Sequence, residues 1–148
     1  MLMVAEFTYH RRVQFAETDM AGIVHFSVFF RYAEEAEHAL LRSVGLGVHM
    51  TDEGGPIGFP RAAARCEYLA PARFEDELEV RIWVSRKGRR SIVYQYTIAS
   101  QGRLLAKGET AVICSRTSPG APITAIPLPA AFDAALQPAA LPPLEFRS

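Results

Sequence analysis

The segment DMAGIVHF, residues 19–26, lies between two stretches of sequence with different hydrophobic periods. Before it, apolar residues alternate with polar ones, as in a half-buried strand that ends near Ala16: Phe7, Tyr9, Val13 and Phe15. After it, apolar residues recur every three or four positions, as along one face of a helix: Phe29, Ala33, Ala36, Leu40 and Val44. Gly45 and Gly47 are stop signals for that helix. The segment is therefore a loop between a strand and a long amphipathic helix.

The opposite side of the predicted helix is charged. Its polar residues are Arg31, Glu34, Glu35, Glu37, His38 and Arg42, with Arg31 and Glu35 one turn apart. We expect this run to be a solvated face. An alternative is that the group from Glu34 to His38 supplies a catalytic carboxylate from the helix itself.

Four further strands follow the helix. Glycine and proline mark residues 50–60 as a loop, and period-two alternation then predicts strands at 64–68, 78–85 and 92–98. Residues 104–115, after a Gln101-Gly102 turn, become apolar on both faces, which is typical of a central strand. One helix among five antiparallel-type strands must bury its apolar stripe against a curled sheet, so the predicted class is α+β.

Length and composition limit the classes of function. A chain of 148 residues fits one domain, and residues 117–148 form a tail with seven of the ten prolines and one possible short helix at 130–136. Sixteen basic residues balance sixteen acidic ones, which argues against nucleic acid as a partner. The sequence has no signal peptide or membrane-length apolar stretch, so we expect a cytoplasmic protein without membrane insertion.

Cysteine and histidine give no sign of a metal or cofactor. Cys66 and Cys114 lie within alternating patterns and are expected to be small hydrophobic residues in a reducing compartment. The four histidines lack the spacing of metal ligands. We therefore expect neither a metal nor a cofactor.

Asp19 is the acidic residue best placed for chemistry. It stands in a glycine-containing loop just before a helix N-terminus, where unpaired N–H groups and partial positive charge can stabilise an oxyanion. A carboxylate there can attack a thioester or activate a water, and a thiolate leaving group needs little acid assistance. The alternative is that Asp19 only caps a turn or the helix.

The stretch from Phe15 to Phe26 resembles the signature of the 4-hydroxybenzoyl-CoA thioesterase family and of the acyl-CoA thioesterases encoded beside the Tol-Pal system. It joins an acid, an Ala-Gly pair, two β-branched residues and the pair His25-Phe26 to an aromatic-rich helix, and the resemblance extends from about Phe7 to Arg116. It implies a hotdog fold, in which a five-stranded antiparallel sheet wraps around one long helix. It also implies subunits that associate as a dimer or a homotetramer.

The resemblance implies roles for single residues. The aspartate at the position of Asp19 is the family's catalytic carboxylate, and the backbone N–H at the position of Phe26 polarises the thioester carbonyl. Related enzymes place their histidine one position later, so His25 departs from the pattern. His25 therefore has either a direct role or a structural one in the loop.

A second group of candidate residues lies in the turn from Arg86 to Ser91. Lys87, Arg89, Arg90 and Ser91 stand around Gly88, and related thioesterases use basic residues here to bind the phosphates of coenzyme A. The alternative is a charged hairpin tip that only aids solubility. Phe29 and Phe59 are expected to shape the acyl pocket.

The predicted function is hydrolysis of an acyl-CoA thioester. Three alternatives remain open: an acyl carrier protein as substrate, a hydratase or dehydratase, and a hotdog protein that binds acyl-CoA without hydrolysing it. The paired His and acid of a hydratase are not evident, and a loop aspartate has no purpose in binding alone. The acyl group, whether aromatic, short or of medium length, stays open.

Overall fold

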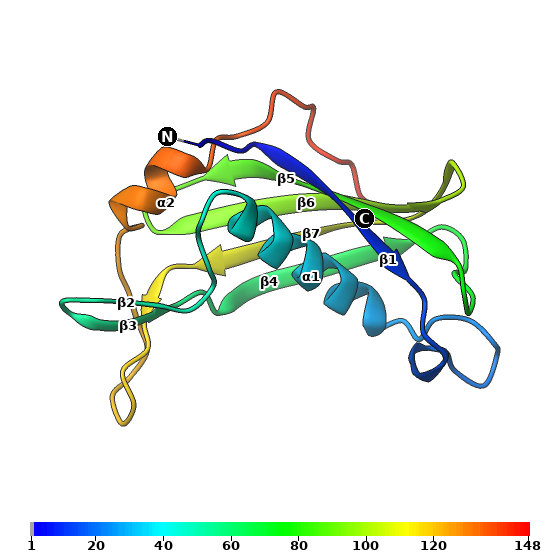
Figure 1. Ribbon diagram of the computed structural model, residues 1–148, viewed down its shortest axis with the longest axis horizontal. Helices are drawn as coiled ribbons and strands as arrows, with labels where there is room; N and C mark the ends of the chain where they lie inside the picture. The colour runs from blue at the N-terminus through cyan, green and yellow to red at the C-terminus, as the bar shows by residue number, and fades with distance from the viewer. Residues whose placement is uncertain (1) are drawn as a thin grey trace.

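The computed structural model describes residues 2–148, and Met1 lies outside the described residues (Figure 1). Five antiparallel strands form a sheet in the order β1-β5-β6-β7-β4. Their bounds are Glu6–Arg12 for β1, Arg61–Tyr68 for β4, Glu77–Lys87 for β5, Ser91–Ser100 for β6 and Arg103–Ile113 for β7. The helix α1, Val28–Ser43, lies across one face of this sheet. The predicted α+β class is confirmed.

The core lies between α1 and the sheet. Phe29, Ala33, Ala36 and Leu40 of the predicted helix stripe are all buried. They pack against the inward residues of β5 and β6, which include Val80, Ile82, Tyr94 and Tyr96. Each large apolar side chain buried here contributes about 1.5–3 kcal/mol to folding. The helix ends at Ser43, and Gly45 then adopts a positive φ of 78°, as its stop signal predicts.

The first strand is shorter than predicted. β1 ends at Arg12, and residues Phe15–Glu17 form a 3₁₀ helix. The backbone N–H of Gln14 donates to Glu17 Oε1 at 2.7 Å, and this local bond turns the chain away from the sheet. Phe15 consequently lies 75% exposed instead of facing the core.

The predicted loop at residues 50–60 is wrong. It forms a hairpin of β2, Met50–Asp52, and β3, Gly55–Gly58. With β8, Ser115–Arg116, and β9, Thr124–Ala125, it makes a second small sheet in the order β2-β3-β8-β9. Arg116 Nη1 binds Asp52 Oδ1 at 2.6 Å and the Gly55 carbonyl at 2.7 Å, so a long-range contact stabilises a segment whose local signals indicated only turns.

The prediction of a solvated charged face on α1 is wrong at Glu37. Its side chain is buried, with 3% of the residue exposed. Arg61 of β4 donates from Nη1 to Glu37 Oε2 at 3.0 Å and from Nη2 to Glu37 Oε1 at 2.5 Å. This bidentate pair compensates for removing the carboxylate from water.

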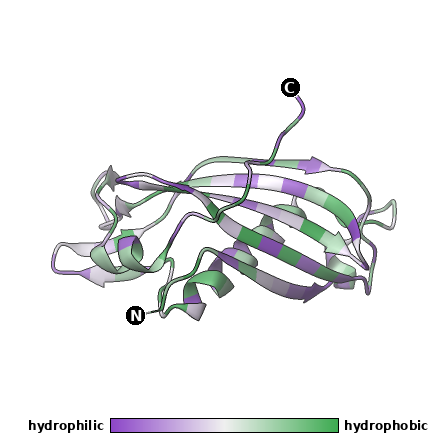
Figure 2. Cartoon of the chain, turned by 90° about the horizontal axis from the view of Figure 1, so that it is seen from above, coloured by the Kyte–Doolittle hydropathy of each residue, from purple (hydrophilic) through white to green (hydrophobic). Residues whose placement is uncertain are grey.

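The predicted short helix in the tail is confirmed as α2, Ala130–Ala135. Beyond it, the chain crosses the face of the sheet opposite α1. Ala139 N–H donates to the Val84 carbonyl at 2.8 Å, Leu144 N–H to Gln95 Oε1 at 2.9 Å and Arg147 N–H to Glu67 Oε2 at 3.0 Å. Polar and apolar residues alternate along the strands (Figure 2), and the crossing segment covers Gln95, which is only 3% exposed.

Strand β7 has a glycine opposite Tyr96, one of the two large buried side chains of β6. Gly108 lies opposite Tyr96 in the register, and a Cβ at position 108 would overlap the Tyr96 ring and approach the Arg65 carbonyl. The Tyr96 ring therefore lies over the β7 backbone and reaches toward β4.

Candidate active site

The loop before α1 is closed by its own backbone. Asp19 N–H donates to the Ile23 carbonyl at 2.8 Å, and Gly22 N–H donates to the Asp19 carbonyl at 3.0 Å. Gly22 has a φ of 78°, a conformation that glycine adopts without steric cost. Thr18 and Val24 pair as an isolated antiparallel bridge at the base of this loop. The backbone of Asp19 therefore takes part in closing a small hydrogen-bonded loop, next to the Thr18–Val24 bridge at its base.

One of the two oxygens of the Asp19 carboxylate accepts a hydrogen bond. Oδ1 accepts a hydrogen bond from Ala21 N–H at 2.8 Å, so Asp19 does cap its own turn. Within residues 2–148 no donor is recorded for Oδ2, and the side chain is exposed. Turn capping fixes the orientation of the carboxylate and leaves one oxygen available to a substrate or a water.

The backbone N–H of Phe26 is available as a donor. Its neighbours are occupied, because His25 N–H donates to the Glu17 carbonyl at 2.9 Å and Ser27 N–H to His25 Nδ1 at 3.3 Å. In the described part of the chain, Phe26 N–H has no recorded acceptor. The Tyr68 hydroxyl donates to the Phe26 carbonyl at 2.7 Å, which fixes the adjoining backbone. A fixed, unpaired N–H just before a helix is suited to an oxyanion.

Asp19 and Phe26 line the same cavity of about 520 Å³ between the loop and the end of β4. The lining is mainly apolar and comprises Asp19, Ile23, Val24, Phe26, Phe29, Tyr68, Leu69, Ala70, Pro71 and Arg73. Phe29 meets the Tyr68 ring edge-on, with centroids 5.1 Å apart. Burial, followed by the neighbouring Cys66, raises the pKa of Tyr68 to about 12, so its hydroxyl remains a donor at neutral pH.

His25 is exposed and turned toward the start of α1. Its Nδ1 lies 2.7 Å from Ser27 Oγ, and its ring stacks on Phe26 with centroids 4.6 Å apart. His25 is not among the residues that line the cavity. These contacts fit the structural alternative for His25, namely support of the loop next to the Phe26 N–H.

The other predicted site residues lie at the opposite end of the sheet. Lys87 is ten residues along β5 from Glu77, the end next to the loop, which corresponds to about 33 Å of strand. Its ammonium donates to the carbonyls of Asp133 and Leu136 at 2.7 and 2.9 Å. Arg89, Arg90 and Ser91 lie in or beside the same turn, and the Phe59 ring packs on Phe132 at 4.8 Å. Of the other site residues predicted from the sequence, only Phe29 lines the same cavity as Asp19 and Phe26 within one chain.

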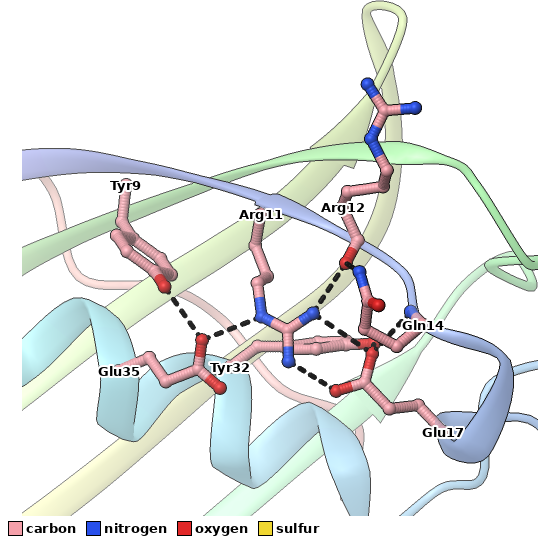
Figure 3. A network of polar contacts seen from close by, with 7 residues as sticks. All are labelled: Tyr9, Arg11, Arg12, Gln14, Glu17, Tyr32 and Glu35. Carbon is pink, nitrogen blue, oxygen red and sulfur yellow. Dashed lines mark hydrogen bonds and ion pairs between the residues drawn. The ribbon is translucent and has the colours of Figure 1, made fainter.

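Sequence reasoning missed Arg11 and Glu17. Arg11 binds the carboxylates of Glu17 and Glu35 (Figure 3), although it stands on the inward face of β1 between Tyr9 and Val13. A charged residue on the inward face of a strand needs an oppositely charged partner. The alternation of β1 places Arg11 on its inward face, so the sequence did indicate that Arg11 has such a partner.

The described residues contain no group of three His, Cys, Asp or Glu side chains placed to hold a metal ion. Among these same residues, no helix has the length and apolar character needed to cross a membrane.

A long helix packed against a five-stranded antiparallel sheet defines the hotdog fold. Solved structures of thioesterases share this fold. The 1,4-dihydroxy-2-naphthoyl-CoA thioesterase from Synechocystis is 28% identical, with a TM-score of 0.77 over 88% of this chain and 95% of that one. A gentisyl-coenzyme A thioesterase is 26% identical, with a TM-score of 0.74 over 86% of this chain and 99% of that one.

The sequence itself matches the thioesterase superfamily over residues 21–107. A 1,4-dihydroxy-2-naphthoyl-CoA hydrolase of Synechocystis sp. (strain ATCC 27184 / PCC 6803 / Kazusa) is 32% identical over 110 residues, 73% of this chain and 80% of the relative. The chain belongs to the thioesterase superfamily. The predicted hotdog fold and thioesterase class are confirmed, while the roles of individual site residues stay predictions.

Proposed function

We propose that this enzyme hydrolyses an acyl-CoA thioester with Asp19 as its essential carboxylate and Phe26 N–H as the oxyanion donor. One observation carries the proposal: a half-free carboxylate and an unpaired backbone N–H line one apolar cavity. The thioester carbonyl would bind at Phe26 N–H, and Asp19 would either attack the carbonyl carbon or activate a water. Both routes develop negative charge on the same oxygen, which the N–H stabilises.

Hydroxylated aromatic acyl groups are the proposed substrates. The relatives act on 1,4-dihydroxy-2-naphthoyl-CoA and gentisyl-CoA by their names. The aromatic rings of Phe29 and Tyr68 in the cavity wall support a flat acyl group. The alternative is that the acyl group is carried by an acyl carrier protein instead of coenzyme A. The set of substrates described below distinguishes these two carriers.

We infer that the complete site needs a second copy of the chain. β4 is an edge strand with mostly exposed residues, and pairing two β4 strands antiparallel would place the partner's Arg61 end beside the Tyr68 end of this chain. The basic turn lies at the Arg61 end, because Ser91 is paired with Ile113 and Arg61 with Val112. Arg89 and Arg90 would then reach the CoA of the other subunit. A monomer in light scattering would contradict this.

The decisive experiment is free-thiol release from aromatic and straight-chain acyl-CoAs and from an acyl carrier protein thioester. Asp19→Asn keeps the Oδ1 acceptor for Ala21 N–H and is expected to lower kcat about 10²–10⁴-fold. Asp52→Asn is the matched control, because Asp52 Oδ1 accepts from Gly54 N–H at 2.9 Å in the same kind of turn, within the β2-β3 hairpin. Full activity of Asp19→Asn would eliminate the proposed role. Tight acyl-CoA binding without turnover by wild type would favour a binding protein.

A further inference from the structure

A cluster of polar side chains joins three elements beside the loop: β1, the 3₁₀ turn and α1 (Figure 3). Arg11 of β1 is its centre. Its Nη2 lies 2.5 Å from Glu17 Oε2, and its Nε lies 2.8 Å from Glu35 Oε1. We call Arg11, Glu17 and Glu35, together with Tyr9 and Tyr32, the Arg11 clamp.

Two tyrosines complete the clamp. The Tyr32 hydroxyl donates to Glu17 Oε1 at 2.9 Å, and the Tyr9 hydroxyl donates to Glu35 Oε1 at 2.8 Å. Burial, followed by the hydrogen bond to Glu17, raises the pKa of Tyr32, so the phenol remains a donor across the neutral range. The Glu17 carboxylate therefore has donors from a strand, a helix and its own turn, and its position is determined on three sides.

Glu17 is also the residue at which the loop closes. Its carbonyl accepts the hydrogen bond from His25 N–H at 2.9 Å, and the next residue, Thr18, pairs with Val24. Glu17 thus stands two positions before Asp19 and holds by its backbone the residue directly before Phe26. Any movement of Glu17 moves both groups of the proposed site.

We propose that Arg11 and Glu17 are positioning residues for hydrolysis, which hold Asp19 and Phe26 N–H in their productive relation. This inference rests on the proposed function of Asp19. Neither residue lines the cavity, so each acts through the loop. A misplacement of about 1 Å in a catalytic constellation can cost about 100-fold in rate, so a few partly buried bonds at the base of the loop are enough to matter.

The next residue along β1 provides a matched control. Arg12 pairs with Glu75 and Glu77, and these side chains are about half exposed. The Arg12 side chain has no recorded contact with the loop among residues 2–148. Arg11 and Arg12 are adjacent in β1, so equivalent substitutions in the two pairs each remove one ion pair made by this strand.

The test compares Glu17→Gln with Glu77→Gln in steady-state kinetics on the best acyl-CoA substrate. Glutamine keeps the size of the side chain and one acceptor oxygen but loses the charge that Arg11 binds. We expect Glu17→Gln to lower kcat about 10- to 100-fold with KM changed by less than about twofold, and Glu77→Gln to match wild type. Equal kcat values for the two variants would overturn the inference.

Arg11→Lys and Arg12→Lys repeat the comparison without removing charge, and they carry the test if Glu17→Gln does not fold. A lysine cannot bind Glu17 and Glu35 together with a planar fork, so Arg11→Lys is expected to lose kcat while Arg12→Lys does not. Hydrogen exchange gives an independent measurement. The amides of residues 18–26 should exchange faster in Glu17→Gln than in wild type. In Glu77→Gln their exchange rates should equal those of wild type.

A double-variant cycle separates this inference from the proposed function. In an Asp19→Asn background, Glu17→Gln should lower the residual rate less than it lowers kcat of wild type, because the part of the clamp's effect that acts through Asp19 is already lost and only the part that acts through Phe26 N–H remains. A full additional loss would show that Glu17 acts independently and would overturn the inference. Retained activity in Asp19→Asn alone would overturn the proposed function, whereas an inactive Asp19→Asn with a fully active Glu17→Gln would overturn only the clamp.

Discussion

On one flank of α1, Arg11 from edge strand β1 binds Glu35; on the other flank, Arg61 from edge strand β4 binds Glu37. The two arginines differ in their second carboxylate. Arg11 also binds Glu17, which belongs to the Asp19 loop, whereas Arg61 also approaches Glu34, which belongs to the same helix. An arginine–glutamate contact therefore connects α1 to the Asp19 loop on the β1 flank. On the β4 flank, the corresponding contact connects α1 only to the sheet.

The carboxylates also differ in how they are satisfied. Glu35 and Glu17 each accept a hydrogen bond from a tyrosine in addition to Arg11. In the described chain, the only donor recorded for the buried carboxylate of Glu37 is Arg61. The β4 flank should therefore contribute more to folding and the β1 flank more to the geometry of the loop.

The largest expected effect on stability is that of Arg61→Met. This change leaves the Glu37 carboxylate buried without a partner, which should lower the free energy of unfolding by about 3 kcal/mol, the low end for a broken buried pair because Arg61 is partly exposed. Arg11→Met should cost less, about 1–2 kcal/mol, because Glu17 and Glu35 keep their tyrosine donors. Urea unfolding of both variants measures the difference. Equal losses would remove the distinction between the flanks.

A smaller effect is expected for Glu35→Gln. Both of its recorded donors bind Oε1, and glutamine keeps an acceptor oxygen, so we expect a loss of about 1 kcal/mol in the free energy of unfolding. Because Glu35 does not touch the loop directly, kcat should fall less than in Glu17→Gln. Urea unfolding and thiol-release kinetics on the same preparation measure both quantities. A larger kcat loss at Glu35 would place the critical contact in the helix instead of the loop.

The smallest effect concerns alkaline pH and compares Tyr32 on the β1 flank with Tyr94 on the β4 flank. Burial raises the pKa of both phenols above the usual 10.0, with further contributions from Glu17 and Glu37 respectively. The folded protein holds these protons more tightly than the unfolded chain, so stability is full below about pH 10 and falls as pH rises above it. Tyr32→Phe and Tyr94→Phe should each flatten that fall, measured as urea midpoints from pH 9 to 11. An unchanged slope in either variant would show that its phenol is not held more tightly in the folded state.

Much of the architecture was predictable from hydrophobic period. The apolar stripe from Phe29 to Leu40 can be buried on only one face of the helix, and the alternating residues of β5 and β6 on only one face of the sheet. These two faces form the common core. The hairpin of β2 and β3 was not predictable, because Arg116 holds it from sixty-four residues away in sequence, at Asp52. The burial of Glu37 was missed for the same reason, since its partner lies on β4.

The candidate site was predictable where it is local in sequence. Asp19, Phe26 and Phe29 lie within eleven residues and meet at one cavity. Arg89, Arg90 and Phe59 do not join them in one chain, because the sheet holds the two ends of β5 apart. The fold alone brings Leu69 and Arg73 to the cavity, since they lie more than forty residues beyond Phe26.

The space above Gly108, which the Tyr96 ring fills, has a consequence for inheritance. Any side chain there would displace the Tyr96 ring, and a smaller residue at 96 would leave a void of its own in the core. A smaller residue at 96 would still leave the Arg65 carbonyl 2.7 Å from a Cβ at position 108, so a change at Tyr96 does not make room for a side chain at Gly108. We therefore expect lineages with this fold to keep glycine at position 108 even where position 96 varies.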